Sequence, residues 1–344
     1  MLEAFSDGEA EAWERSSIAN DYSRTEQVVY RGLGSTIFLG VFGTTSSAVA
    51  IKILMKSNFD SDAELKAATN EVAIHAVIPP HPNVIRLLAA EETPVAFLLV
   101  MPYAPCGDLW ELTKFGHTYC EAEVRNCAAQ MLHALHHIHT TCSLVHGDIK
   151  PHNFLLVRCE SKHVLQLCDF GLAVHPDSPD GTVTFRGLRG TSGWIAPELL
   201  QSRDYNHLVD LFGCGLILFR MLGGYRPFEP PANFTGGVEF DDCYWCHVSD
   251  LCRQFLGLLL SVDPAGRPSA ANAREHPWIM GPAPAEPSAE QLMRLAEFGP
   301  PPVRDFLFWW PLPAGLENPA TAPAPNYEFQ PRVRSPYDFS AMQY

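Results

Sequence analysis

The most constraining feature of this 344-residue sequence is one short polar run, His146–Asn153, which reads HGDIKPHN. The run offers a carboxylate at Asp148, an ammonium group at Lys150 and an amide oxygen at Asn153. A second carboxylate, Asp169, follows 16 residues after Asn153, behind a strand-like apolar stretch. Carboxylate and amide oxygens are the hard ligands that magnesium prefers in proteins. The run therefore predicts a magnesium-dependent site carried on a loop.

This set of groups suits the transfer of a phosphoryl group to a hydroxyl, a reaction that depends on positioning and charge stabilisation. We expect Asp148 to orient the acceptor hydroxyl and Lys150 to reach the γ-phosphate. Asn153 and Asp169 are the expected ligands of Mg2+. The sequence thus predicts ATP and Mg2+ as cofactors.

Further motifs extend the pattern in both directions along the chain, and with them residues 26–280 resemble the eukaryotic-type protein kinases. They are Lys52 in Val49–Lys52 (VAIK), Glu71 in a predicted helix, His81–Asn83 (HPN), Gly190–Thr191, Ala196–Glu198 (APE), Asp210 and Arg267. The resemblance implies that Lys52 holds the α- and β-phosphates and pairs with Glu71. It also implies that Thr191 bridges Asp148 and Lys150.

The same resemblance implies a structural role for two further elements of the large lobe. Asp210 is expected to begin a buried helix, and Glu198 is expected to pair with Arg267 without taking part in chemistry. The family implied is the serine/threonine kinases, because Pro151 follows Lys150 and Thr191 lies in the GTSGWIAP run.

A glycine-rich run, Gly32-Leu-Gly34-Ser35, is the expected cover of the phosphates. Backbone amides of Gly34 and Ser35 can approach a phosphate group. Ile37 stands where a third glycine is usual, and its β-branched side chain restricts the backbone there.

The resemblance also places the rest of the nucleotide. Met101 is expected to guard the inner end of the site, and the adenine to bond to the backbone of Pro102 and Ala104. Asp108 is expected either to meet the ribose hydroxyls or simply to cap a helix. The residues expected to sandwich the base are Leu39, with Val41 as an alternative, Ala50 and Leu155.

Gly147 departs from the family, which most often has arginine at this position to bind a phosphate on the activation loop. Without that cation the phosphate loses its receptor. We therefore expect activity that does not require phosphorylation of the activation loop. His152 and Arg220 stand where kinases that read upstream arginines often have glutamate. We expect no strong preference for a multi-arginine substrate.

The predicted fold class is α+β, with a β-rich small lobe over about residues 26–101 and a helical large lobe over about 105–280. Residues 1–25 are predicted to be an acidic, mobile extension, and residues 281–344 a tail that holds 13 of the 29 prolines. The apolar stretch 306–310 is expected to dock on the kinase domain or on a partner.

Strands are predicted over residues 28–30, 37–41, 48–53, 84–88 and 97–101, from short β-branched runs bounded by turn residues. A helix is predicted over 62–77, with Ser61 or Asp62 as its cap, and another over 121–139, from apolar positions at helical spacing. Further apolar helices are predicted over 208–222 and 249–260.

The composition of the chain limits the kinds of partner that it is expected to bind. A net charge of -15 argues against nucleic-acid binding, and no apolar stretch is long enough to span a membrane. The absence of a secretory signal and the scattered cysteines predict free thiols in an intracellular compartment. Protein substrates are the expected partners.

Two alternatives stay open. A pseudokinase scaffold would retain the fold without turnover, and Ile37 and Gly147 lend it some support. A small-molecule phosphotransferase could share the His-Gly-Asp run, but such enzymes lack the segment 190–198 and the Arg267 partner.

Overall fold

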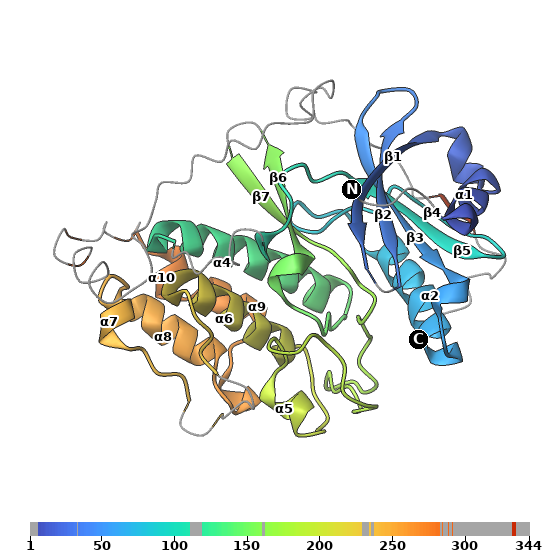
Figure 1. The fold of residues 1–344 in the computed structure, drawn as a ribbon. Helices are drawn as coiled ribbons and strands as arrows, with labels where there is room; N and C mark the ends of the chain where they lie inside the picture. The colour runs from blue at the N-terminus through green and yellow to red at the C-terminus, as the bar shows by residue number, and fades with distance from the viewer. Residues whose placement is uncertain are drawn as a thin grey trace.

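The computed structural model describes residues 6–32, 34–110, 119–159, 162–228, 234, 237–282, 284, 288, 291 and 332–334. Two lobes follow one another along the chain, a β-sheet lobe and a helical lobe (Figure 1). The predicted two-lobe α+β fold is therefore confirmed.

The small lobe is built on an antiparallel sheet that a final short strand extends in parallel, in the order β1-β2-β3-β5-β4-β8. Its strands are β1 (Tyr22–Arg31), β2 (Thr36–Phe42), β3 (Ala48–Met55), β4 (Ala89–Glu92), β5 (Ala96–Pro102) and β8 (Arg332–Arg334). The helix α2 (Asp62–Val77) packs against β5. Its bounds are those predicted, because Ser61 caps it by accepting a hydrogen bond from the Glu64 amide.

The large lobe consists of helices and one hairpin, which lies on the side that faces the small lobe (Figure 1). Its elements are α4 (Glu121–His136), β6 (Phe154–Cys159), β7 (Lys162–Leu167), α5 (Pro197–Leu200), α6 (Leu208–Gly223), α7 (Asp242–Trp245), α8 (Asp250–Leu259), α9 (Ala270–Arg274) and α10 (Pro277–Met280). Short helical turns lie at Ser17–Asn20, Lys56–Asn58, His137–Thr141, Pro151–Asn153 and Pro264–Gly266. None of the helices described here is both long and apolar enough to cross a bilayer.

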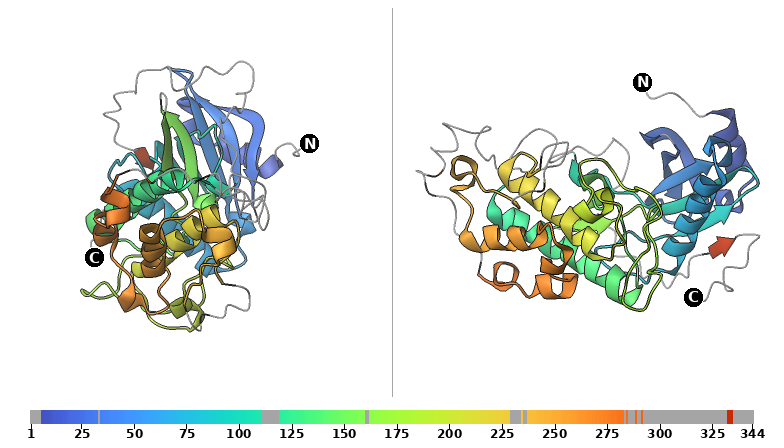
Figure 2. Two further views of the ribbon diagram at one scale, coloured as in Figure 1. Left: turned by 90° about the vertical axis from the view of Figure 1, so that its left-hand side faces the viewer. Right: turned by 90° about the horizontal axis from the view of Figure 1, so that it is seen from below.

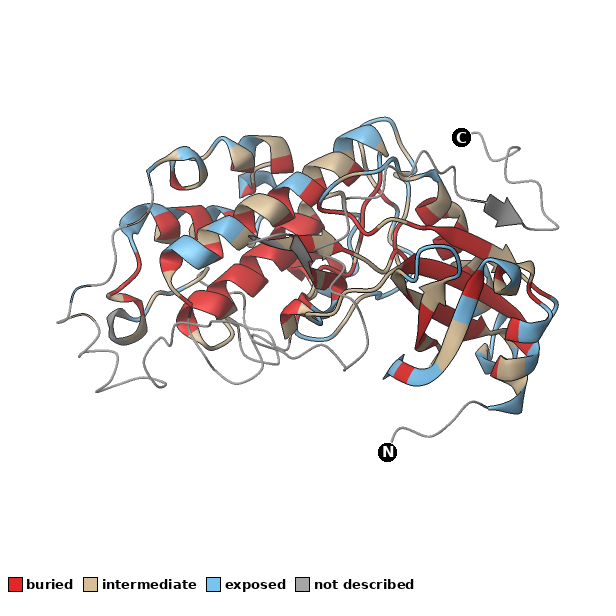
Figure 3. Cartoon of the chain, turned by 90° about the horizontal axis from the view of Figure 1, so that it is seen from above, coloured by how far each residue is buried: buried red, intermediate tan, exposed pale blue. Residues whose placement is uncertain are grey.

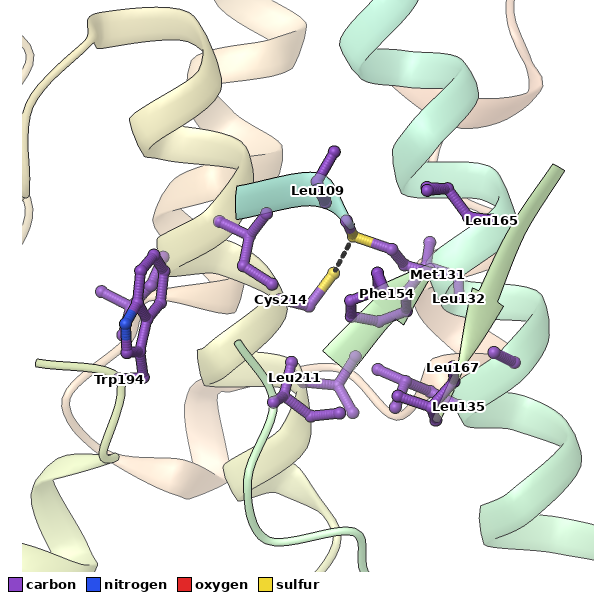
Figure 4. Packing of buried hydrophobic residues seen from close by; sticks show 14 of the residues in the cluster. Leu109, Met131, Leu132, Leu135, Phe154, Leu165, Leu167, Trp194, Leu211 and Cys214 are labelled. Carbon is purple, nitrogen blue, oxygen red and sulfur yellow. Dashed lines mark hydrogen bonds between the residues drawn. The ribbon is translucent and has the colours of Figure 1, made fainter. Parts of the chain in front are cut away.

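The core of the large lobe forms where α4 and α6 pack together beneath the β6–β7 hairpin (Figure 4). Met131 of α4 and Cys214 of α6 meet there, with their sulfur atoms 3.7 Å apart. Every residue of α6 except Leu208 and Arg220 is buried, which explains why this helix reads as apolar almost all round. Buried residues continue into the strands of the small lobe (Figure 3).

One predicted strand is wrong. Residues 84–88, apart from the partly exposed Arg86, are buried but form no extended ladder, and the strand of this region is β4, which begins at Ala89. Val84 makes only isolated bridges, to His81 and to Leu167 of β7. The apolar run predicted the burial correctly, but burial of a short run does not distinguish a strand from a packed loop.

The N-terminal extension is also different from the prediction. Instead of a mobile segment, the structure has the helix α1 (Asp7–Glu14) and a following turn, both packed on the small lobe (Figure 1). Ala12, Trp13 and Ile18 are buried in one cluster with residues from one face of the sheet, among them Ile51 and Leu98. A capping box between Ser6 and Glu9 starts the helix.

Polar contacts fix the extension at both ends. Glu91 of β4 accepts hydrogen bonds from the hydroxyls of Ser16 (2.7 Å) and Ser17 (2.9 Å) and from the Ile18 amide (3.1 Å). At the other end, the buried Glu9 carboxylate bonds to Thr36 at the start of β2. Burial raises the pKa of Glu9, but the bonds from Thr36 and Ser6 outweigh it and hold that pKa below its ordinary value.

We expect Trp13→Ala to lower the free energy of unfolding by about 3–5 kcal/mol, because it removes a large buried side chain and leaves a cavity. Urea unfolding of the whole chain measures this. The matched control is Glu14→Ala, which alters an exposed side chain on the same helix. Equal unfolding midpoints for the two variants would show that the extension does not pack as described.

The described parts of the tail contact both lobes. Arg125 of α4 donates a 2.9 Å hydrogen bond to the Gly281 carbonyl, and Gln291 donates to the Cys246 carbonyl. The strand β8 pairs in parallel with β4, with Val333 opposite Ala90 (Figure 2). The predicted docking stretch, residues 306–310, lies outside the described residues.

Candidate active site

Lys52 lies in the middle of β3, the central strand that pairs with β2 on one side and β5 on the other. Its ammonium nitrogen lies 2.6 Å from Oε1 of Glu71 on α2 and 3.2 Å from Oδ1 of Asp169. The structure therefore brings together three charges from positions 52, 71 and 169. Gly171 completes this corner, since a Cβ there would lie 3.3 Å from the Glu71 carboxylate.

Lys52 and Asp169 stabilise each other's charge, whereas burial, together with the Asp169 carboxylate, raises the pKa of Glu71 above its ordinary value. Burial lowers the pKa of Lys52, but the carboxylates of Asp169 and Glu71 outweigh it and raise that pKa above its ordinary value. The Lys52 ammonium in turn lowers the pKa of Asp169 to about 2. At neutral pH the cluster thus holds an ionised lysine beside an ionised Asp169.

The catalytic-loop residues form a second cluster. One carboxylate oxygen of Asp148 accepts hydrogen bonds from the Thr191 amide (2.9 Å) and the Thr191 hydroxyl (2.8 Å). The other oxygen lies 2.6 Å from the Lys150 ammonium, which also contacts the Thr191 hydroxyl at 2.7 Å. Thr191 thus contacts both partners that the sequence analysis assigned to it, and the Asp148 carboxylate is held from two sides.

Asn153 and Asp169 supply the oxygen atoms suited to a metal. The Asn153 side-chain nitrogen donates to the Asp148 backbone carbonyl at 2.8 Å, which leaves the amide oxygen as its available ligand atom. Asp169 follows directly after Cys168, whose amide donates to the Asn153 carbonyl at 2.9 Å. An ionised carboxylate and an amide oxygen on adjoining segments fit the preferences of Mg2+.

Asp210, at the start of α6, fixes the backbone of the catalytic loop through hydrogen bonds. Its carboxylate accepts hydrogen bonds from the His146 amide (2.8 Å), the Gly147 amide (2.9 Å) and the His139 ring (2.8 Å). The Gly147 backbone has φ +76°, a left-handed conformation that costs other residues about 1–2 kcal/mol. Glycine at this position is therefore free of strain as well as of charge.

Sequence reasoning missed a row of three aromatic rings, in tilted and edge-on contact, that joins the two clusters. Phe170 is fully buried between His75 of α2, at 5.0 Å between ring centroids, and His146 of the catalytic loop, at 5.4 Å. His75 lies four residues after Glu71, so both side chains share one face of the helix. The four-residue spacing from Glu71 is the feature of the sequence that could have identified His75 as a neighbour of this site.

His75 predicts a pH dependence. Its ring donates to the Ile85 carbonyl at 2.9 Å, and burial lowers its pKa from 6.5 to about 4. The unfolded chain therefore binds a proton between pH 6.5 and 4 that the folded chain does not. We expect this residue to lower the free energy of unfolding by about 2 kcal/mol when the pH falls from 7 to 5.

Denaturant unfolding of the wild type and of His75→Leu at pH 7 and pH 5 measures this contribution. The leucine variant should show a smaller loss of stability on acidification, whatever its stability at pH 7. Identical losses in the two proteins would contradict a neutral, buried His75.

The residues expected around the base lie in register across three strands. Leu39 of β2 pairs with Ala50 of β3, and Ala50 pairs with Met101 of β5. Ile37 pairs with Lys52 in the same way, and so shares one face of the sheet with it. At the end of the glycine-rich run, the Gly32 amide donates to the Ser35 carbonyl at 2.9 Å, which closes the turn that contains Gly34.

The segment after β5 links this sheet to the large lobe. The Ala104 carbonyl, one of the groups expected to meet adenine, accepts a 3.2 Å bond from the Gly107 amide. Asp108 forms an antiparallel bridge with Leu155 of β6, which brings Leu155 next to the linking segment that begins at Pro102. The residues predicted to hold the base thus come from both lobes.

Glu198 and Arg267 form a buried ion pair that is separate from the catalytic loop. The Arg267 guanidinium donates to both carboxylate oxygens, at 2.7 and 2.9 Å. It also donates to the backbone carbonyls of Leu208 and Ser261. All these contacts are structural, and none reaches the Asp148 cluster.

Fold and site together define a two-lobed, kinase-type phosphotransferase domain. The family model described as "Protein kinase domain" matches residues 23–279. The chain therefore belongs to the protein kinase family.

Curated relatives support the same family. Myosin light chain kinase A of Dictyostelium discoideum is 33% identical over 256 residues, which cover 72% of this chain and 85% of that protein. Calcium/calmodulin-dependent protein kinase type 1 of Caenorhabditis briggsae is 31% identical over 274 residues, or 77% of this chain and 74% of that protein. Serine/threonine-protein kinase DCLK3 of Mus musculus is 33% identical over 245 residues, which cover 68% of this chain but only 30% of that protein. The chain thus matches about a third of the length of that last relative.

Proposed function

We propose that this protein is a serine/threonine protein kinase that transfers the γ-phosphate of ATP to hydroxyl groups of protein substrates. The observation that carries the proposal is the Asp148 carboxylate, fixed by Thr191 and Lys150 on a loop that Asp210 anchors. The name of the Mus musculus relative, a serine/threonine-protein kinase, supports serine and threonine as acceptors.

Each group has a defined task in this proposal. The Asp148 carboxylate orients the acceptor hydroxyl and accepts its proton, since its hydrogen bonds from Thr191 and Lys150 fix its position. The Lys150 ammonium places positive charge beside the acceptor. The Lys52 ammonium, held by Glu71, places positive charge where the α- and β-phosphates would lie.

Asn153 and Asp169 are the residues that would hold Mg2+. When bound there, the metal would neutralise charge on the phosphates. The protein prepares this site without the metal, because Lys52 keeps Asp169 ionised and Asp148 fixes the Asn153 amide.

The test compares the phosphorylation of a protein with that of small alcohols. The whole chain, with radiolabelled ATP and Mg2+, should label a generic basic protein on serine or threonine and leave small alcohols unlabelled. Labelling of small alcohols alone would favour a small-molecule phosphotransferase. No labelling of any acceptor, with ATP still bound, would favour a pseudokinase scaffold.

We also propose that activity does not require phosphorylation of the activation loop. Hydrogen bonds and an ion pair to two carboxylates already hold the activation loop in place. Asp177 accepts from the Thr184 amide (2.8 Å) and pairs with Arg186 (2.7 Å), and Asp204 accepts from the Phe185 amide at 2.8 Å. These bonds supply the order that a phosphate would otherwise provide.

The double variant Thr182→Ala, Thr184→Ala should therefore keep kcat within about twofold of the wild type, because the backbone amides of both residues still donate to Asp180 and Asp177 after the hydroxyl groups are removed. Steady-state assays of protein expressed with and without a phosphatase check this. A collapse of activity in the double variant would refute the proposal.

Protein substrates remain the proposed partners, and an intracellular compartment the proposed location. The cysteines that the structure describes are all free thiols, which suits a reducing environment.

A further inference from the structure

The N-terminal extension contacts the hairpin of the glycine-rich run through a buried carboxylate. Oε1 of Glu9 on α1 lies 3.6 Å from Nη1 of Arg31, the last residue of β1. The same carboxylate hydrogen-bonds to the side chain of Thr36, the first residue of β2. Arg31 and Thr36 are register partners, and the turn that contains Gly34 lies between them. Glu9 therefore contacts both strands at the base of that turn.

These contacts lie on the face of the sheet opposite to Lys52. Directly opposed residues of two strands share one face, and successive residues of a strand alternate between faces. Thr36 opposes Ile53 of β3, which is buried in the same cluster as Trp13 of α1. The next residue, Ile37, opposes Lys52 and so lies on the other face. Glu9 thus acts on the hairpin from the face that points away from the expected phosphates.

The helix that carries Glu9 is itself fixed to the rest of the small lobe. Glu91 of β4 accepts hydrogen bonds from the turn that follows α1, among them one of 3.1 Å from the Ile18 amide. At the start of α1, a Cβ on Gly8 would lie 3.2 Å from Cε of Met55, the last residue of β3. A carboxylate on a helix that is anchored in this way can hold the two strand ends in one position.

We propose that Glu9 is a positioning residue for ATP, which holds the pair Arg31 and Thr36 so that the glycine-rich turn keeps its phosphate-binding position. A turn binds its ligand only while it has the competent conformation, so the apparent dissociation constant rises as the population of that conformation falls. The helix α1 then supports nucleotide binding without touching the nucleotide. This inference rests on the proposed function, because it takes ATP as the ligand of the turn.

The test compares two ligands of the whole chain by calorimetric titration, adenosine and an ATP analogue that cannot be hydrolysed, with Mg2+ present. Adenosine lacks the phosphates that the turn would cover. In Glu9→Ala we expect the dissociation constant of the analogue to rise about tenfold, as for a turn that is competent about a tenth of the time, and that of adenosine to change less than about twofold. A rise of both constants by the same factor would overturn the proposal.

A double-mutant cycle tests whether Glu9 acts through Thr36. Thr36→Val removes the hydroxyl group at nearly constant volume and should also weaken binding of the analogue. The double variant should bind it no more weakly than Glu9→Ala alone, because both changes break one contact. Additive losses would contradict the proposal. The matched control is Glu11→Ala on the same helix, whose side chain is 50% exposed, and it should bind both ligands as the wild type does.

Hydrogen exchange in the absence of ligand gives a readout that does not depend on binding. The backbone amides of residues 28–38 should exchange faster in Glu9→Ala than in the wild type, whereas those of α8 should exchange at the same rate in both. Equal exchange of residues 28–38 in the two proteins would show that Glu9 does not hold the hairpin and would overturn the proposal.

Kinetic assays keep this inference separate from the proposed kinase activity. In Glu9→Ala we expect KM for ATP to rise about tenfold and kcat to stay within about twofold, because the groups around Asp148 are untouched. If the wild type phosphorylates no protein, the proposed activity fails, but a selective loss of the analogue in Glu9→Ala would still support the role of Glu9. A wild type that binds the analogue no more tightly than adenosine would refute that role.

Discussion

Replacing Asp148 with asparagine should lower kcat for phosphate transfer by about 10²–10⁴-fold, the usual contribution of a positioned acid or base. An amide cannot accept the proton of the substrate hydroxyl. Its NH2 group would also face donors, because the Thr191 amide and the Lys150 ammonium both donate to the present carboxylate. Steady-state assays with a peptide substrate measure the loss.

The matched control is Asp250→Asn, the same chemical change on an exposed side chain of α8. It should behave as the wild type. The Michaelis constant for ATP should change little in Asp148→Asn, because Lys52 and Asp169 are intact. A kcat near that of the wild type in Asp148→Asn would remove Asp148 from the chemistry.

Replacing Arg267 with alanine should lower the free energy of unfolding by about 3–5 kcal/mol, because it leaves the buried Glu198 carboxylate without its partner. The Arg267 side chain is 0% exposed, and it joins α5 to the segment before α9 through both carboxylate oxygens. Urea unfolding of the purified chain provides the measurement.

An exposed ion pair on α1 supplies the control. Arg15 and Glu11 pair at 2.6 Å with side chains 59% and 50% exposed, so Arg15→Ala should cost less than about 1 kcal/mol. Similar costs for the two arginine variants would show that the Glu198–Arg267 pair is not the buried support described here.

The sequence indicated which residues the structure brings together around Asp148, because they lie in short runs at characteristic spacing. Asp148, Lys150 and Asn153 lie on one short loop, so their closeness in space follows from their closeness in sequence. The helix 62–77 was predicted with its observed bounds, since Ser61 marks its start.

The contacts of the N-terminal extension could not be read in the same way. Its apolar residues are few, and the burial of Trp13 depends on a sheet face formed by residues much later in the chain. Only the capping box of Ser6 and Glu9 was available as a local signal for α1. Acidic composition suggested mobility, but tertiary packing and the bonds to Glu91 outweigh it.

The same limit applies to the contacts of Trp110, whose ring stacks on the His152 ring and lies next to the Arg220 guanidinium. The sequence analysis noted His152 and Arg220 as separate departures from acidic residues. That both contact one tryptophan ring follows only from the path of the chain between the lobes and from the length of α6.

The most direct test of the central claim is an autophosphorylation assay that compares the wild type with Asp169→Asn. The variant loses the negative charge that Lys52 stabilises on Asp169. It also replaces one of the two carboxylate oxygens, which are the expected ligands of Mg2+, with an NH2 group. We predict that the wild type incorporates radiolabelled phosphate on serine or threonine and that the variant, folded to the same extent by thermal unfolding, incorporates almost none. Equal incorporation by the two proteins would show that the label does not come from this site and would contradict the assignment of the chain as an active kinase.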